Sequence, residues 1–109
     1  MKRSFIMTSI FEKAWRDMGL GDAELRQLET TLLSDPNAGD VIPGLSGARK
    51  VRIPLLGHGK SGGGRVIYVD VVVDECIYLL LAYAKNSQED MTNEQKRSLK
   101  KLVELIKED

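Results

Sequence analysis

Apolar residues recur at helical spacing in three stretches of the chain. The first stretch opens at Ser9 with a Ser-x-x-Glu pattern, which predicts a capping box, and its apolar residues continue to Gly19. A second helix is predicted from Asp22 to the turn that begins at Ser34. The third opens at Thr92, again with a capping-box pattern, and continues toward the C-terminus. The chain is therefore predicted to contain two N-terminal helices and one C-terminal helix.

Strand-like patterns fill the middle of the chain. Residues 3–7 predict a short first strand, and residues 48–54 predict a basic one. Residues 66–73 and 76–85 are almost continuously apolar, which indicates central strands that are covered on both faces. Because the connections between the last three strands are too short for a crossover helix, these strands are expected to form an antiparallel meander.

These elements follow one another in the order β-α-α-β-β-β-α. This order predicts an α+β fold, a small antiparallel β-sheet with two N-terminal helices and one C-terminal helix packed against one face. The 109 residues are enough for a single modest core, so we expect one domain over residues 1–109.

Charge is balanced over the whole chain but not along it. The chain has 16 basic and 16 acidic side chains, yet residues 49–65 contain five basic and no acidic ones. The flanking segments, residues 1–48 and 66–109, both have more acidic than basic side chains. A local excess of this kind is either a solvated hairpin surface or a site for a polyanion. Nucleic acid therefore stays open as a partner, although the net charge alone would argue against it.

Cysteine usage and hydropathy indicate the compartment. Cys76 is the only cysteine and cannot form an intramolecular disulfide, which suits a reducing cytoplasm. No apolar stretch approaches the ~20 residues of a transmembrane helix, and the N-terminus lacks the apolar block of a signal peptide. We expect a cytoplasmic protein without membrane contact.

The glycine-rich segment of residues 57–64 resembles a phosphate-binding loop only in part. Gly59-Lys60-Ser61 is present, but the first glycine of the GxxxxGK[ST] pattern would fall on Pro54. A strand follows the loop where the pattern requires a helix. Both the spacing and the context argue against a nucleoside triphosphatase.

Metal and nucleophile chemistry have little support in the sequence. His58 is the only histidine, so a zinc site would have to depend on carboxylates, and Ser61 lacks the surroundings of a catalytic serine. We expect no metal and no cofactor. His58 is interpreted either as an ordinary exposed loop residue or as part of an anion site.

Basic and aromatic residues on the last three strands are the strongest candidates for a site. Side chains two positions apart in a strand share a face, so Lys50 and Arg52 point the same way, as do Tyr83 and Lys85. Arg65 begins the strand between these two pairs. We expect all five to converge on one patch, with Lys60 reaching in from the glycine-rich loop. Such a patch suits a polyanion, because arginine matches phosphate oxygens and tyrosine stacks on a base or donates a proton.

Two short motifs give this patch a family resemblance. The elements GxRKxR…GKxGGxRxxY, over residues 47–68, and YLLxxYxKN, over residues 78–86, are specific when they occur together. With them, the chain resembles the RelE superfamily of toxins from bacterial type II toxin–antitoxin pairs, nearest to the HigB-like branch. The fold that this resemblance implies, a small sheet with two N-terminal helices and one C-terminal helix, agrees with the predicted order.

The resemblance also implies an activity. Members of the family are endoribonucleases that cut mRNA in the ribosomal A site, by metal-free attack of the RNA 2′-hydroxyl on the adjacent phosphate, and so inhibit translation. A cognate antitoxin, here expected to be of the helix-turn-helix type, silences the toxin and alone contacts operator DNA. The alternatives left open are a module of the same fold that binds RNA or the ribosome without cutting, and a homologue with impaired catalysis that mainly binds an antitoxin.

Site residues carry over one by one onto the matching positions. Lys50 and Arg52 match positions that orient the RNA, and Arg65 matches the arginine that stabilises the transition-state phosphate. Lys85 matches the strand motif in which family members place further basic or acid–base groups, and Tyr83 and Lys60 match recurrent positions of the HigB-like branch. The catalytic group predicted on this basis is Arg65, Lys50, Arg52, Lys85 and Tyr83. Further RNA contacts are predicted at Lys60, Arg49 and His58. Which residue is the general base and which the general acid is left open.

Overall fold

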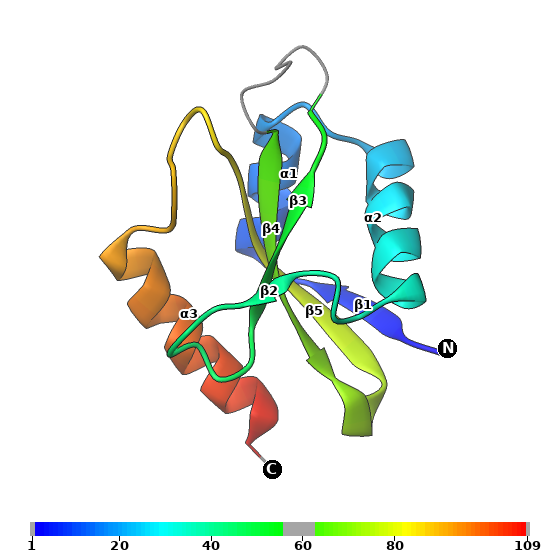
Figure 1. Ribbon diagram of the computed structural model, residues 1–109, viewed down its shortest axis with the longest axis vertical. Helices are drawn as coiled ribbons and strands as arrows, with labels where there is room; N and C mark the ends of the chain where they lie inside the picture. Colours follow the sequence, from blue (N-terminus) through cyan, green and yellow to red (C-terminus); the bar gives the residue numbers. More distant parts are fainter. Residues whose placement is uncertain (1, 56–62, 109) are drawn as a thin grey trace.

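The computed structural model describes residues 2–55 and 63–108. The predicted RNA contacts His58 and Lys60 lie outside these residues. The elements, in chain order, are β1 (Ser4–Met7), α1 (Ser9–Asp17), α2 (Asp22–Ser34), β2 (Asp40–Val41), β3 (Arg49–Ile53), β4 (Gly64–Val71), the 3-10 turn η1 (Val72–Asp74), β5 (Cys76–Ala84) and α3 (Asn93–Lys107) (Figure 1).

The strands form one five-stranded sheet in the order β1-β5-β4-β3-β2. β3, β4 and β5 are antiparallel neighbours, which confirms the predicted meander. The α+β fold is also confirmed, but the sheet is mixed, because β1 runs parallel to β5. A parallel pair needs a long connection, and most of the chain lies between these two strands. The sheet also contains the short strand β2, which pairs with β3 at the edge and was not among the predicted strands.

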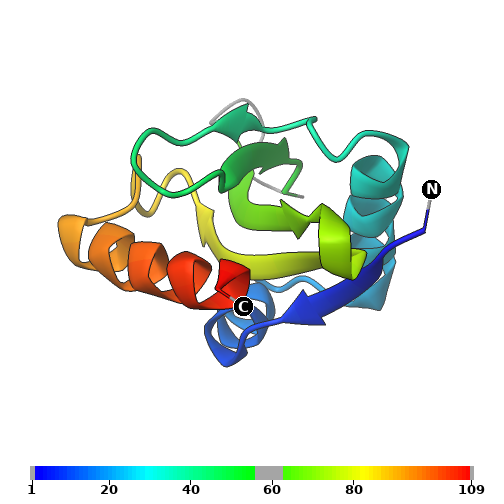
Figure 2. The same ribbon diagram turned by 90° about the horizontal axis from the view of Figure 1, so that it is seen from below.

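The helices cover both faces of the sheet, so the expectation that they share one face was wrong. Figure 1 shows α2 and α3 on opposite sides of β3 and β4, and Figure 2 shows the same separation from below. The physical reason is visible in β4, whose side chains alternate between two cores. Val66 and Tyr68 belong to the core under α1 and α2, whereas Ile67 and Val69 belong to the core under α3. A strand that is apolar on both faces must be covered on both faces.

The helix boundaries follow their caps. The α1 N-cap is Thr8 rather than the predicted Ser9, because the Thr8 hydroxyl accepts a hydrogen bond from the Phe11 N–H at 2.9 Å. The predicted capping box of α3 is confirmed. The Thr92 hydroxyl accepts from the Gln95 N–H at 3.0 Å, and the Gln95 side chain accepts from the Thr92 N–H at 2.9 Å. This box fixes the start of α3 against the chain that leaves β5.

β5 contains an irregularity that matters for the site. The register of the β4–β5 pair shifts between Ile67, which pairs with Leu81, and Tyr68, which pairs with Leu79. Leu80 is therefore the extra residue of a β-bulge, and it is fully buried in the core under α3. The extra residue shifts the alternation of side chains between the two faces of β5. Beyond the bulge, each β5 side chain therefore lies on the same face as the β4 residue opposite it.

Candidate nucleic-acid interface

Arg52, Arg65 and Tyr83 form one row across the three central strands. Arg52 of β3 pairs with Arg65 of β4, and Arg65 pairs with Tyr83 of β5. Residues directly opposite each other on antiparallel strands share a face, with Cβ atoms about 5 Å apart. This face is the one that α3 covers, because Tyr83 belongs to the α3 core. We refer to these three residues as the Arg52–Arg65–Tyr83 row.

The two lysines predicted for the patch lie beside this row. Lys50 precedes Arg52 by two positions on β3 and pairs with Ile67, so it shares the face of the row. Lys85 follows the last residue of β5, and its backbone N–H donates to the Gly63 carbonyl oxygen at 3.0 Å. That bond holds Lys85 beside the start of β4, at the end of the sheet where Arg65 lies. The structure thus puts Lys50, Arg52, Arg65 and Tyr83 on one face of the sheet, with the main chain of Lys85 at the end of the sheet near Arg65.

The two central members of the row are buried. Arg65 is 7% exposed, and its Nη1 donates to the Gly64 carbonyl oxygen at 3.0 Å. Tyr83 is 5% exposed, and among the described residues its hydroxyl has no hydrogen-bond partner. Burial raises the pKa of Tyr83 to about 12. The negative charge of Asp90 and an approach of the hydroxyl to its carboxylate, too long or misaligned for an ordinary hydrogen bond, act in the same direction, whereas the charge of Arg65 opposes them. The Tyr83 hydroxyl is therefore protonated at neutral pH and is a hydrogen-bond donor.

Asp90 and Lys96 also belong to this neighbourhood, and the sequence analysis missed both. The Lys50 Nζ lies 3.5 Å from Asp90 Oδ1, and the Lys96 Nζ lies 3.6 Å from Asp90 Oδ2. The Met91 N–H donates to Asp90 Oδ1 at 2.7 Å and, together with the two lysines, lowers the pKa of the Asp90 carboxyl. Asp90 comes from the β5–α3 connection and Lys96 from the first turns of α3, so no local pattern places them next to β3.

Arg49 lies on the opposite face from the row. It pairs with Tyr68, which belongs to the core under α1 and α2. Its Nη1 donates to the Gly39 carbonyl oxygen at 2.8 Å, just before β2. The structure therefore separates Arg49 from the Arg52–Arg65–Tyr83 row, and the contacts that Arg49 makes hold the turn before β2.

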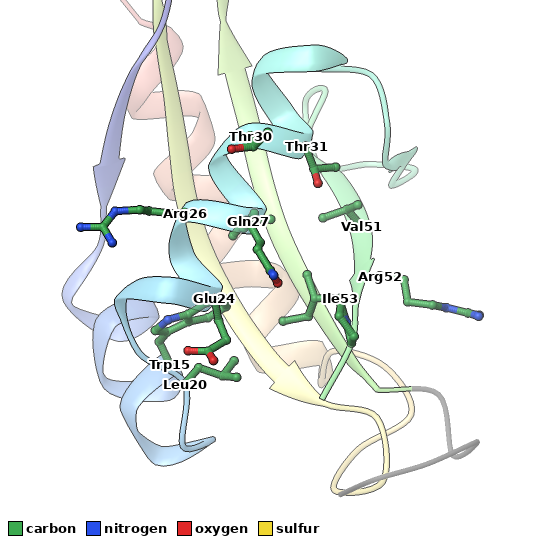
Figure 3. Close-up of a pocket in the computed structure, with 12 residues that line it drawn as sticks. Trp15, Leu20, Glu24, Arg26, Gln27, Thr30, Thr31, Val51, Arg52 and Ile53 are labelled. Carbon is green, nitrogen blue, oxygen red and sulfur yellow. The ribbon is translucent and has the colours of Figure 1, made fainter. Parts of the chain in front are cut away.

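A pocket of about 530 Å³ lies on the same far side, between α2 and β3. Figure 3 shows Gln27, Thr31 and Ile53 around it; Arg52 also borders the pocket, but its side chain extends away from it. The pocket and the Arg52–Arg65–Tyr83 row are therefore on different faces of the sheet.

Within residues 2–55 and 63–108, no group of three or more His, Cys, Asp or Glu side chains is arranged to hold a metal ion. No described helix is long and apolar enough to span a membrane.

Fold and site together define a small α+β protein whose mixed sheet carries a row of basic residues and a buried tyrosine under its C-terminal helix. A family model described as the RelE toxin of the RelE/RelB toxin–antitoxin system matches residues 3–108. The chain belongs to the RelE toxin family. Assignment to the HigB-like branch stays a prediction.

Solved structures of E. coli RelE have the same fold. A double mutant of the toxin in the free state has a TM-score of 0.56 and 19% identity, and the match covers 82% of this chain and 90% of that one. The toxin in the intact E. coli RelBE toxin–antitoxin complex has a TM-score of 0.56 and 17% identity, over 77% of this chain and 96% of that one. The isolated E. coli RelE toxin has a TM-score of 0.56 and 15% identity, over 94% and 99% of the two chains.

Proposed function

We propose that this member of the RelE toxin family is an endoribonuclease that cleaves mRNA on the ribosome and so inhibits translation. The observation that carries the proposal is the Arg52–Arg65–Tyr83 row, in which two guanidinium groups and a protonated phenol lie side by side on adjacent strands. This combination provides charge stabilisation and a proton donor at one place without a metal ion.

The chemistry follows from what RNA cleavage by its own 2′-hydroxyl requires. The 2′-oxygen attacks the adjacent phosphorus, and the bond to the 5′-oxygen breaks, leaving a cyclic phosphate and a 5′-hydroxyl. A base must take the 2′-proton, cations must stabilise the pentavalent phosphate, and an acid must protonate the leaving oxygen. No oxidant, reductant or cofactor takes part.

Each residue of the row suits one of these tasks. Arg65 is a buried guanidinium, and a cation in a low-dielectric site stabilises developing negative charge more strongly than one in water. Arg52 is exposed beside it and is placed to hold the RNA phosphate. Tyr83 is assigned as the proton donor because its phenol is a hydrogen-bond donor that lies directly opposite Arg65. Lys50 and Lys85 are the candidates for the base.

A partner is proposed on the same grounds. The E. coli RelBE structure is a toxin–antitoxin complex, and the present chain shares its fold. We propose a cognate antitoxin that keeps the toxin inactive, together with ribosomes and mRNA as the targets. The expectations that the antitoxin is of the helix-turn-helix type, and that it alone contacts operator DNA, rest on the family resemblance.

Induced expression tests the proposal. Wild-type protein should arrest growth and produce new mRNA ends inside codons, mapped by primer extension on purified ribosomes. Arg65→Ala should abolish both effects, whereas Arg49→Ala, on the other face, should leave cleavage by the folded protein intact. Thermal unfolding of each variant separates loss of activity from loss of fold.

A binding module without catalysis predicts a different result. It would stall ribosomes at defined positions, seen by toeprinting, without new mRNA ends. An unchanged cleavage pattern with Arg65→Ala, or normal growth with a folded and ribosome-bound wild-type protein, would overturn the nuclease proposal.

A further inference from the structure

Asp90 lies between two lysines in a way that resembles a bound phosphate. Its two carboxylate oxygens each contact a different ammonium group, Lys50 of β3 through Oδ1 and Lys96 of α3 through Oδ2. A phosphodiester also presents two anionic oxygens on one atom. The two lysines come from different elements, so the anion between them joins the sheet to the C-terminal helix.

From this arrangement we propose that Lys50 and Lys96 form a second phosphate site for the RNA, which the Asp90 carboxylate occupies until a phosphate of the RNA displaces it. Lys96 is then an RNA-contacting residue on α3, and Asp90 is an internal competitor of the substrate. Lys50 binds phosphate as a cation on this view, so Lys85 remains as the candidate for the base. The inference rests on the proposed function, since it places a phosphate next to the one held at the Arg52–Arg65–Tyr83 row.

The solvent exposure of the cluster allows this exchange. The side chains of Lys50, Lys96 and Asp90 are 32%, 42% and 50% exposed, so an RNA backbone can reach all three from solvent. Ion pairs at such exposed positions contribute little and are screened by salt. A phosphate of the RNA therefore has a weak internal contact to replace.

The main chain around Asp90 is held by hydrogen bonds that do not involve its carboxylate, so it can stay in place when the side chain rotates away from the two lysines. The Gln88 Nε2 donates to the Asp90 carbonyl oxygen at 2.8 Å and to Gln95 Oε1 at 3.0 Å, and Gln95 belongs to the capping box of α3. Only rotation of the Asp90 side chain is needed, with loss of its contact to the Met91 N–H. The same rotation moves negative charge away from Tyr83, whose hydroxyl is buried without a partner among the described residues.

The test compares two variants that remove the same charge in different places. Asp90→Asn keeps an oxygen acceptor for the Met91 N–H and removes the competing charge. Asp17→Asn removes the charge of an ordinary exposed ion pair, between Lys13 Nζ and Asp17 Oδ2 at 2.8 Å on α1. Both variants gain one unit of positive charge, so a difference between them reports the location of the charge.

The probe is a short 2′-O-methyl RNA, which the full-length protein can bind but cannot cleave. Asp90→Asn should bind it about threefold more tightly than Asp17→Asn, a size set by the weakness of exposed ion pairs. Adding Lys96→Ala to Asp90→Asn should remove the gain. In the wild-type protein, the RNA should shift the amide NMR signal of Met91 together with those of Arg65 and Tyr83.

Equal affinities of Asp90→Asn and Asp17→Asn, or a gain that survives Lys96→Ala, would overturn the inference. Shifts at Arg65 and Tyr83 without a shift at Met91 would overturn it as well, while leaving the proposed nuclease surface in place. No shift at any of the three amides would count against both.

Discussion

Arg65 of β4 and Tyr83 of β5 are directly opposite each other, and both are almost completely buried. A guanidinium beside a phenol whose hydroxyl lacks a hydrogen-bond partner among the described residues is a costly arrangement for a small protein. A fold selected only for stability would place an apolar residue at position 83. The pair therefore marks a part of the sheet that is built at a cost to stability, as a functional site would be.

Tyr83→Phe should separate activity from stability. The change removes a buried hydroxyl that makes no hydrogen bond with the described residues, so the free energy of unfolding should stay within about 0.5 kcal/mol or rise. Cleavage should fall by about 10²-fold or more if the hydroxyl is the proton donor. Urea unfolding and primer extension measure the two effects.

Tyr68→Phe is the matched control. The Tyr68 hydroxyl donates to the Pro36 carbonyl oxygen at 2.7 Å and accepts from the Gly39 N–H at 3.0 Å. Its removal should lower the free energy of unfolding by about 1–3 kcal/mol and leave cleavage by the folded protein unchanged. A Tyr83→Phe protein that is as destabilised as Tyr68→Phe, with full activity, would contradict the proposed role.

The pKa of Tyr83 also predicts a difference at alkaline pH. The folded protein keeps this proton up to about pH 12, whereas an unfolded tyrosine loses it near pH 10. Above about pH 10 the unfolded tyrosine loses its proton while the folded one keeps it, which favours the unfolded state. The stability that the raised pKa contributes is therefore fully present below about pH 10 and is lost as the pH rises to about 12. Wild type should lose more stability than Tyr83→Phe between pH 9 and about 11.5 in urea titrations. Parallel losses would contradict the burial of the hydroxyl.

Arg52 and Arg49 should differ in their effect on RNA binding. Arg52 is exposed on the face of the row, so Arg52→Ala should weaken binding of RNA and reduce the slope of log affinity against log salt by about 1. Arg49→Ala should leave that slope unchanged. It should lower the free energy of unfolding by about 1 kcal/mol, because the bond to the Gly39 carbonyl is lost. Equal slopes for both variants would contradict the assignment of faces.

Gly39 is predicted to tolerate no side chain. A Cβ there would lie 2.7 Å from the Lys50 backbone oxygen and 3.0 Å from the Tyr68 ring. Gly39→Ala should therefore lower the free energy of unfolding by about 1–3 kcal/mol. At Gly21 the nearest atom to an added Cβ is 3.6 Å away, so Gly21→Ala should cost under about 1 kcal/mol. Thermal unfolding of the two variants tests the difference.

The sequence predicted the parts of the site that depend on local periodicity. Alternation along β3 correctly put Lys50 and Arg52 on one face, and the short connections correctly made β3, β4 and β5 neighbours. The same alternation puts Arg49 on the other face, but the family motif grouped it with the RNA contacts. Local alternation thus predicts the face on which Arg49 lies, whereas its role as an RNA contact stays a prediction.

What the sequence could not predict depends on contacts between distant segments. The Lys50–Asp90 ion pair joins residues 40 positions apart, and neither residue's neighbours indicate it. The bulge at Leu80 and the parallel direction of β1 have the same origin, because both are decided by pairing with other strands. By contrast, β4 is apolar on both faces, so its sequence already indicated that a helix such as α3 would cover the second face of the sheet.

The parallel pairing of β1 with β5 has a consequence for biosynthesis. The Thr8 hydroxyl, just after β1, donates to the Leu80 carbonyl oxygen across a sequence separation of 72 residues. A contact between residues so far apart forms late in folding, because the chain entropy lost on closing a long loop must be overcome before the strand pairing lowers the free energy. Of the five strands of the sheet, β1 is synthesised first and is therefore among the last to find its place. A nascent chain has neither a finished sheet nor the complete Arg52–Arg65–Tyr83 row until β5 has been synthesised.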